Sequence, residues 1–180
     1  MGGERHNLPM RNRLHRWAII AAFLAAGIGT PLIAKDKTMF KTLDDRMLVA
    51  PQITAADIAE AKAQGVTLII NNRPDGEDPS AAQSAEIATV ARAAGLDYVG
   101  IPVGQGGFAL PQVEAMTIAL ANARGKTLAY CRSGTRSTLL WSLARAKAGD
   151  DPAILRAKAQ AAGYDLAPVA TLIDMLATKK

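Results

Sequence analysis

The segment from Cys131 to Ser137, CRSGTRS, places a thiol beside two arginines in one short loop. An apolar stretch typical of a buried strand precedes it, and a helix-forming stretch, TLLWSLARA, follows it. Backbone N–H groups at a helix start bind anions, and Arg136 can donate two hydrogen bonds to a tetrahedral oxyanion. These groups favour the thiolate form of Cys131, which makes it a candidate nucleophile. The remaining expected anion-binding residues of the loop are Arg132, Ser133, Gly134, Thr135 and Ser137.

A buried structural cysteine on a tight strand-to-helix turn is the alternative interpretation, because lone cysteines are usually inert. Two arginines close to the thiol, however, would be costly in a protein core that holds no anion. The composition of the loop therefore favours the nucleophile.

A second polar loop, NNRPDGEDP, follows the apolar run at 66–70 and carries three carboxylates. Asp75 is the candidate general acid that would protonate a leaving group. Arg73 is the candidate for a second contact with the anion. Pro-Asp-Gly is also an ordinary turn sequence, in which a carboxylate is usually solvated, so the acid role competes with a simple turn.

Many other chemistries are excluded by composition. The chain has 180 residues, and its two histidines, His6 and His15, both precede the apolar stretch that begins at Trp17. With no later histidine and one cysteine, the domain has no Ser-His-Asp triad, no Cys-His pair and no zinc site of the usual ligand type. No disulfide can form within the chain, and we expect neither a metal nor a cofactor.

The formal charge of +5 is concentrated at the N-terminus, because residues 1–37 carry a net +4. The remainder is nearly neutral and has no basic face with interleaved aromatic residues, so no nucleic-acid partner is expected. The expected partner is a small anionic substrate, either a phosphate ester or a sulfane sulfur donor.

Residues 17–34 are uncharged and follow the basic segment RNRLHR, a pattern typical of a signal peptide or membrane anchor. We therefore predict a leader at 1–38 and a domain at 39–180. Membrane association through 17–34 would leave the domain anchored or exported on the periplasmic side, since arginines stay in the cytoplasm. If translation starts at Met39, the protein is instead cytoplasmic; a core helix at 17–34 is the third reading.

The remainder alternates apolar runs with helical segments. Strands are expected at 47–50, 66–70, 97–103 and 126–130, because each is short, apolar and bounded by turn residues. Helices are expected from Thr54 to Gly65, from Ser80 with Gln83 to Gly95, from Pro111 to Gly125, and over much of 152–178 with a break near Gly163. Crossover helices predict an α/β fold with a mainly parallel central sheet of about four to five strands and helices on both faces. Ligands then bind beyond the carboxyl ends of the strands, in the loops 71–80, 104–110 and 131–136.

Three segments, GVTLIINNRPDGE, AAGLDYVGIPV and LAYCRSGTRS with Trp141 following, resemble the phosphatase-like domain of the beta-lactamase hydrolase-like family. Their order and spacing are similar to that family from about residue 39 to 147. The family is a bacterial branch of the cysteine-dependent phosphatases and is also labelled a sulfur transferase family. The resemblance implies a dual-specificity-phosphatase-like fold and a nucleophilic Cys131.

Two departures from the phosphatase pattern are visible. Phosphatases of this class have five residues between cysteine and arginine, whereas four separate Cys131 from Arg136, a spacing similar to that of rhodaneses. The superfamily's general acid follows the strand written here as YVGIPV, where this sequence has Gly104 and Gln105. The first hypothesis is a hydrolase of phosphate esters, which the order of helices and strands favours. A sulfurtransferase that carries a persulfide on Cys131, favoured by the shorter loop and the missing acid, and a noncatalytic anion-binding module are the alternatives.

Overall fold

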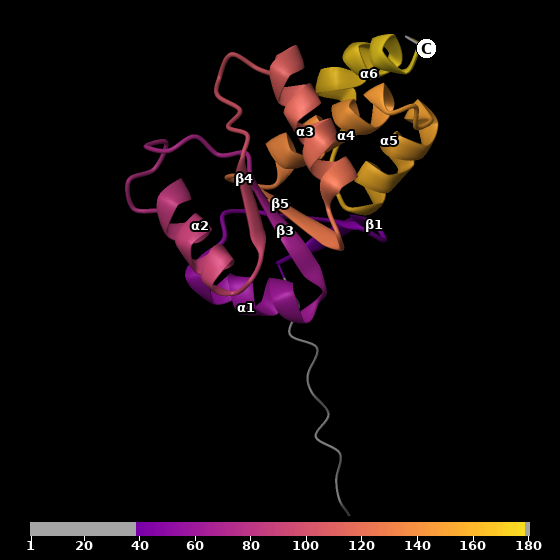
Figure 1. Cartoon of the computed structure of the whole chain (residues 1–180). Coiled ribbons are helices and arrows are strands. Elements are labelled where there is room, and N and C mark those ends of the chain that lie inside the picture. The colour runs from indigo at the N-terminus through magenta and orange to yellow at the C-terminus, as the bar shows by residue number, and fades with distance from the viewer. Residues whose placement is uncertain (1–38, 179–180) are drawn as a thin grey trace, which may run out of the picture. The chain divides into compact units, whose positions relative to one another are not determined.

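The computed structural model describes residues 39–178, which form a five-stranded sheet with helices on both faces (Figure 1). The strands are β1 (Lys41–Asp44), β2 (Met47–Ala50), β3 (Val66–Asn71), β4 (Asp97–Gly100) and β5 (Lys126–Tyr130). The helices are α1 (Ala55–Ala63), α2 (Ser84–Ala93), α3 (Leu110–Asn122), α4 (Thr135–Lys147), α5 (Pro152–Ala161) and α6 (Ala170–Ala177), with a 3-10 turn η1 (Ala167–Val169) before α6.

The strand order is β1-β2-β5-β3-β4, in which β1 pairs antiparallel with β2 and every other pair is parallel. The predicted mainly parallel α/β sheet is confirmed. β5 lies at the centre of the sheet, so the loop that follows it opens between the loops after β2 and β3. This topology places Cys131 in the middle of the carboxyl edge, where ligands bind in sheets of this kind.

Side chains alternate between two cores along the central strands. On β3, Leu68 and Ile70 pack into the core beneath α3 to α6, while Ile69 packs into the core beneath α1 and α2. On β5, Ala129 faces the first core and Leu128 the second. The strands are buried on both faces, which explains their continuous apolar runs. Figure 1 shows α1 and α2 covering one face and the later helices the other.

Several elements differ from the sequence prediction. The sequence does not predict strand β1, because KTLD has a single apolar residue, Leu43, and lies at the sheet edge. Helix α2 begins at Ser84 rather than near Ser80, since Ser80 donates its N–H and hydroxyl to Asp78 in a turn. Strand β4 ends at Gly100, just before Pro102, which has no N–H to donate.

The leader predicted at 1–38, with its apolar stretch at 17–34, lies outside the described residues. Between residues 39 and 178, no helix has the length and apolar character needed to cross a membrane.

The core beneath α4 supplies a first test of the packing. Leu140 on α4 is fully buried, so Leu140→Ala leaves a cavity and should lower the free energy of unfolding by about 2–5 kcal/mol. Ile118 on α3 is 61% exposed, and Ile118→Ala should change it by less than about 0.5 kcal/mol. Urea unfolding of both variants measures the difference; equal effects would contradict this assignment of the core.

Candidate active site

The candidate site lies where three loops leave the carboxyl edge of the sheet. The cradle loop, residues 131–136, follows β5 and ends in the first turn of α4. The loop 72–83 follows β3, and the segment 101–109 follows β4. Because β4 and β5 each pair in parallel with β3, these loops leave the sheet at one edge, as predicted.

The cradle loop turns back toward the thiol. Cys131 is fully buried, and its Sγ accepts a hydrogen bond from the N–H of Gly134 at 3.2 Å. Gly134 has φ +88° and stands at the N-cap of α4, so the chain turns through a left-handed conformation before the helix starts. The thiol therefore faces the N-terminus of α4, where backbone N–H groups and the helix dipole favour negative charge.

The guanidinium of Arg136 reaches across to both neighbouring loops. Its Nη1 donates to the carbonyl oxygen of Val103 at 2.8 Å and lies 2.7 Å from Oε2 of Glu77. Its Nη2 donates to Oε1 of Glu77 at 2.9 Å. The Glu77 hydrogen bond is the main cause that raises the pKa of Arg136, and the charge of nearby Cys131 adds to it.

Arg73, the residue predicted to make a second contact with the anion, pairs with side chains around the site. It is 8% exposed; its Nη1 donates to Oε1 of Gln52 at 2.8 Å and its Nε to Oε1 of Glu77 at 2.9 Å. Its Nη2 is 3.4 Å from Asp78. Arg73 is thus joined to Arg136 through Glu77, a residue to which the sequence had given no role. The hydrogen bond from Arg136, more than Arg73, lowers the pKa of Glu77.

Asp75, the predicted general acid, makes a helix contact. Its Oδ1 accepts the N–H of Ser84, the first residue of α2, at 2.8 Å. No hydrogen bond or ion pair among residues 39–178 joins Asp75 to the cradle loop. The same bond explains why α2 begins at Ser84, because a carboxylate caps the first free N–H of a helix.

The other predicted anion-binding residues differ in their surroundings. Arg132 is exposed, and its side chain has no ion pair within the described part of the chain. Ser133 donates its hydroxyl to Thr135 at 3.1 Å. Ser137 is fully buried, and its hydroxyl has no hydrogen-bond partner there.

Tyr164, which follows α5, contacts the cradle loop through its hydroxyl. The sequence pattern gives no indication of this residue. Its hydroxyl donates to the carbonyl oxygen of Ser133 at 3.3 Å. A Cβ at Gly134 would lie 2.1 Å from this hydroxyl oxygen. Burial raises the pKa of Tyr164, and the charge of Cys131 contributes. The sequence could not identify Tyr164, because it lies far from the loop along the chain and only the fold brings the two together.

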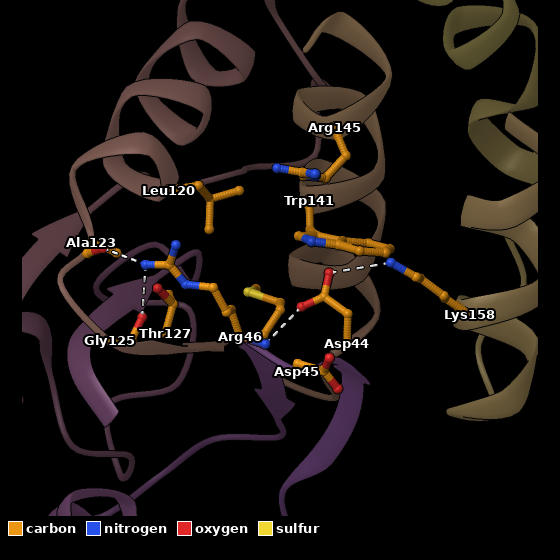
Figure 2. A pocket seen from close by; sticks show the side chains of 11 residues that line it. Asp44, Asp45, Arg46, Leu120, Ala123, Gly125, Thr127, Trp141, Arg145 and Lys158 are labelled. Carbon is orange, nitrogen blue, oxygen red and sulfur yellow. Dashed lines mark hydrogen bonds and ion pairs between the residues drawn. The ribbon is translucent and has the colours of Figure 1, made fainter. Parts of the chain in front are cut away.

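A separate cavity of about 300 Å³ lies at the amino edge of the sheet, beside the β1–β2 turn (Figure 2). Arg46 donates there to the carbonyls of Ala123 and Gly125, and Lys158 lies 3.5 Å from Asp44. Arg145 is paired with Asp150, which does not line the cavity. Its cationic side chains already have partners, and no cysteine lines it. These features favour the carboxyl edge of the sheet, and not this cavity, as the candidate reactive site.

No group of three or more His, Cys, Asp or Glu side chains within residues 39–178 is arranged to hold a metal ion. The charged groups of the site are instead two guanidiniums, a carboxylate and the thiol.

The sheet order and the cradle loop at the start of α4 define a phosphatase-like domain with a buried cysteine in that loop. The chain belongs to the beta-lactamase hydrolase-like protein family: the profile of that family's phosphatase-like domain matches residues 39–148. A beta-lactamase hydrolase-like protein of Agrobacterium fabrum is 36% identical over 107 residues, which cover 59% of this chain and 25% of that protein. The chain thus spans about a quarter of the length of this curated relative.

Solved structures agree with the family assignment. The crystal structure of a candidate phosphatase from Neisseria meningitidis Z2491 matches with a TM-score of 0.68 and 33% identity, covering 78% of this chain and 99% of that one. PTPMT1 in complex with PI(5)P has a TM-score of 0.61 at 12% identity, covers 77% of this chain and 97% of its own, and shows the shared fold alone.

The contact between Gly134 and Tyr164 leads to a second prediction. Gly134→Ala should lower the free energy of unfolding by about 2–4 kcal/mol, because it combines a strained left-handed alanine with an overlap at Tyr164. Gly95→Ala is the matched control, since its φ is +80° and nothing lies within 4 Å of the added Cβ. In a Tyr164→Phe background the cost of Gly134→Ala should fall. Equal costs for the two glycine variants in urea unfolding would contradict this account of the loop.

Proposed function

We propose that the domain hydrolyses a phosphate ester, with the Cys131 thiolate as nucleophile. The observation that carries the proposal is the N–H of Gly134 directed at Sγ at 3.2 Å, at the N-terminus of a helix that also bears Arg136. The same donors can bind the non-bridging oxygens of a phosphoryl group placed against the thiol. Membership of a family with a phosphatase-like domain agrees with this chemistry.

In the proposed reaction the thiolate attacks phosphorus, the S–P bond forms and the bond from phosphorus to the ester oxygen breaks. The leaving oxygen takes a proton, for which Asp75 is our proposed donor. Water then attacks phosphorus and gives a proton to the Asp75 carboxylate, the S–P bond breaks, and inorganic phosphate leaves with the thiolate and the acid both restored. Arg136 and the loop N–H groups bind the charge that spreads over the equatorial oxygens in both steps.

The proposed substrate is a small phosphorylated molecule. Among proteins that share the fold, PTPMT1 has been solved with PI(5)P and TpbA of P. aeruginosa with pTyr. Both ligands carry a phosphate monoester, which is the group the cradle loop would bind. The exposed segment from Gly104 to Gly107 borders the site, so the remainder of the ester would lie against it.

Sulfur transfer is the second candidate, favoured by the four-residue spacing between Cys131 and Arg136. The thiolate would attack the sulfane sulfur of a donor such as thiosulfate, forming a persulfide and releasing sulfite. A thiophilic acceptor such as cyanide would then take the outer sulfur as thiocyanate and restore the thiolate. This route needs no general acid, and the segment after β4 offers none at Gly104 or Gln105.

Paired assays on the full chain and Cys131→Ser decide between these reactions. Hydrolysis of an aryl phosphate should fall more than about 10³-fold in the variant, because the nucleophile is lost. Thiocyanate production from thiosulfate and cyanide should stay at background in both proteins. Cys131-dependent thiocyanate without phosphate release would instead establish the sulfurtransferase. Phosphate binding without either turnover would leave an anion-binding module.

The proposed role of Asp75 is tested with two aryl phosphates whose leaving phenols differ in acidity. Asp75→Asn should slow the ester of the less acidic phenol at least about tenfold more, because only that phenolate needs a proton as it leaves. Since Asp75 also accepts the N–H of Ser84, thermal unfolding checks that α2 is intact. An equal effect on both esters, or none, would exclude Asp75 as the acid.

A further inference from the structure

Glu77 lies between the guanidiniums of Arg73 and Arg136. Its side chain is 29% exposed, with Oε1 2.9 Å from Nε of Arg73 and Oε2 2.7 Å from Nη1 of Arg136. We propose that Glu77 is a positioning residue, which fixes the Arg136 guanidinium so that one edge of it faces the phosphoryl group bound at Cys131. This inference rests on the proposed function.

An inventory of N–H groups identifies that edge. A guanidinium has five N–H donors in one plane. Glu77 Oε1 accepts one from Nη2, while Nη1 donates to the carbonyl of Val103 and lies 2.7 Å from Glu77 Oε2 in an ion pair. Among residues 39–178, no oxygen accepts the N–H of Nε or the second N–H of Nη2, and these two N–H groups point the same way along one side of the guanidinium. Two parallel donors of this kind match two oxygens of a phosphoryl group.

The carboxylate is itself held in place from the sheet side. Arg73 is 8% exposed and lies two residues after the end of β3. Its Nη1 donates to Oε1 of Gln52, which lies after β2, at 2.8 Å. Backbone N–H of Arg73 also donates to the side chain of Asn71 at 2.8 Å. Arg136 is therefore connected through Glu77 to loops that leave β2 and β3, and through Val103 to the segment after β4. A long side chain held at several points loses less entropy when its ligand binds.

Two other roles for Glu77 fit less well. A proton donor must be protonated at working pH, whereas hydrogen bonding by Arg136 lowers the pKa of Glu77. A carboxylate that blocked the site would occupy the edge that receives the substrate, but Glu77 lies at the edge formed by Nη1 and Nη2. Within residues 39–178, no carboxylate or carbonyl oxygen accepts a hydrogen bond from the edge formed by Nε and Nη2.

The test compares Glu77→Gln with wild type on two aryl phosphates of different leaving-group acidity. A misplaced Arg136 should lower kcat/KM by about 10- to 100-fold, equally for both esters, because charge stabilisation at phosphorus does not depend on the leaving group. Glu114→Gln is the matched control: Glu114 is an exposed carboxylate, 2.7 Å from Lys147 on the outer surface, and this variant should turn over like wild type. A loss confined to the poorer leaving group would make Glu77 the acid. A fall in KM with unchanged kcat would make it a blocking group. Either result overturns the proposal.

A double-mutant cycle shows whether Glu77 acts through Arg136. Lysine has no guanidinium to be oriented, so in an Arg136→Lys background Glu77→Gln should lower kcat/KM by less than a further threefold. If the losses of kcat/KM in the two single variants multiply in the double variant, the two residues act independently and the positioning role is overturned.

A nuclear magnetic resonance measurement keeps this inference separate from the proposed function. The ¹⁵N side-chain signals of Arg136, assigned by their loss in Arg136→Lys, should show slow rotation of the Nη groups in wild type and fast rotation in Glu77→Gln. Unchanged signals would show that Glu77 does not fix the guanidinium, whatever the enzyme turns over. If wild type hydrolyses neither ester, the proposed function fails while this measurement still decides the positioning role.

Discussion

One carboxylate shared by two guanidiniums holds the site together. Without an anion between them, the guanidiniums of Arg73 and Arg136 would repel each other. Glu77 lies at hydrogen-bond distance from both and so pairs the buried charge of Arg73, which would be costly if isolated. Because Arg73 belongs to the loop after β3 and Arg136 to α4, the same ions also fix the distance between two segments far apart in the sequence.

The position of the Cys131 thiol depends on the loops that meet at this edge of the sheet and on the geometry of one turn. Parallel strands bring the loops together, but the orientation of Sγ is set locally by the left-handed Gly134 and its N–H. Helix α4 continues from that turn into the core, where Leu140 and Trp141 are almost completely buried. A helix packed on most of its surface cannot shift without disturbing the sheet, so the donors at its first turn are held in position before any ligand arrives.

The order of strands and helices could be predicted from the sequence because each central strand is apolar on both faces and each crossover helix ends near a glycine. The cradle loop could be predicted because all its groups are consecutive. What could not be predicted came from long-range contacts. Glu77 lies four residues after Arg73, in a loop whose composition is that of any acidic turn. Only the fold brings its carboxylate to Arg136. Asp75 illustrates the converse, since its carboxylate contacts the start of α2 through a bond that no spacing rule indicates.

The contact made by Tyr164 also bears on where the independently folding unit ends. The family profile stops at residue 148, yet the core beneath α4 continues into α5, η1 and α6 through Leu155, Leu166, Val169 and Ile173. The hydroxyl against Gly134 comes from the same stretch. The family profile and the packed core are therefore different lengths of chain. The segment after residue 148 shields that face of α4 and contacts the cradle loop without belonging to the profile.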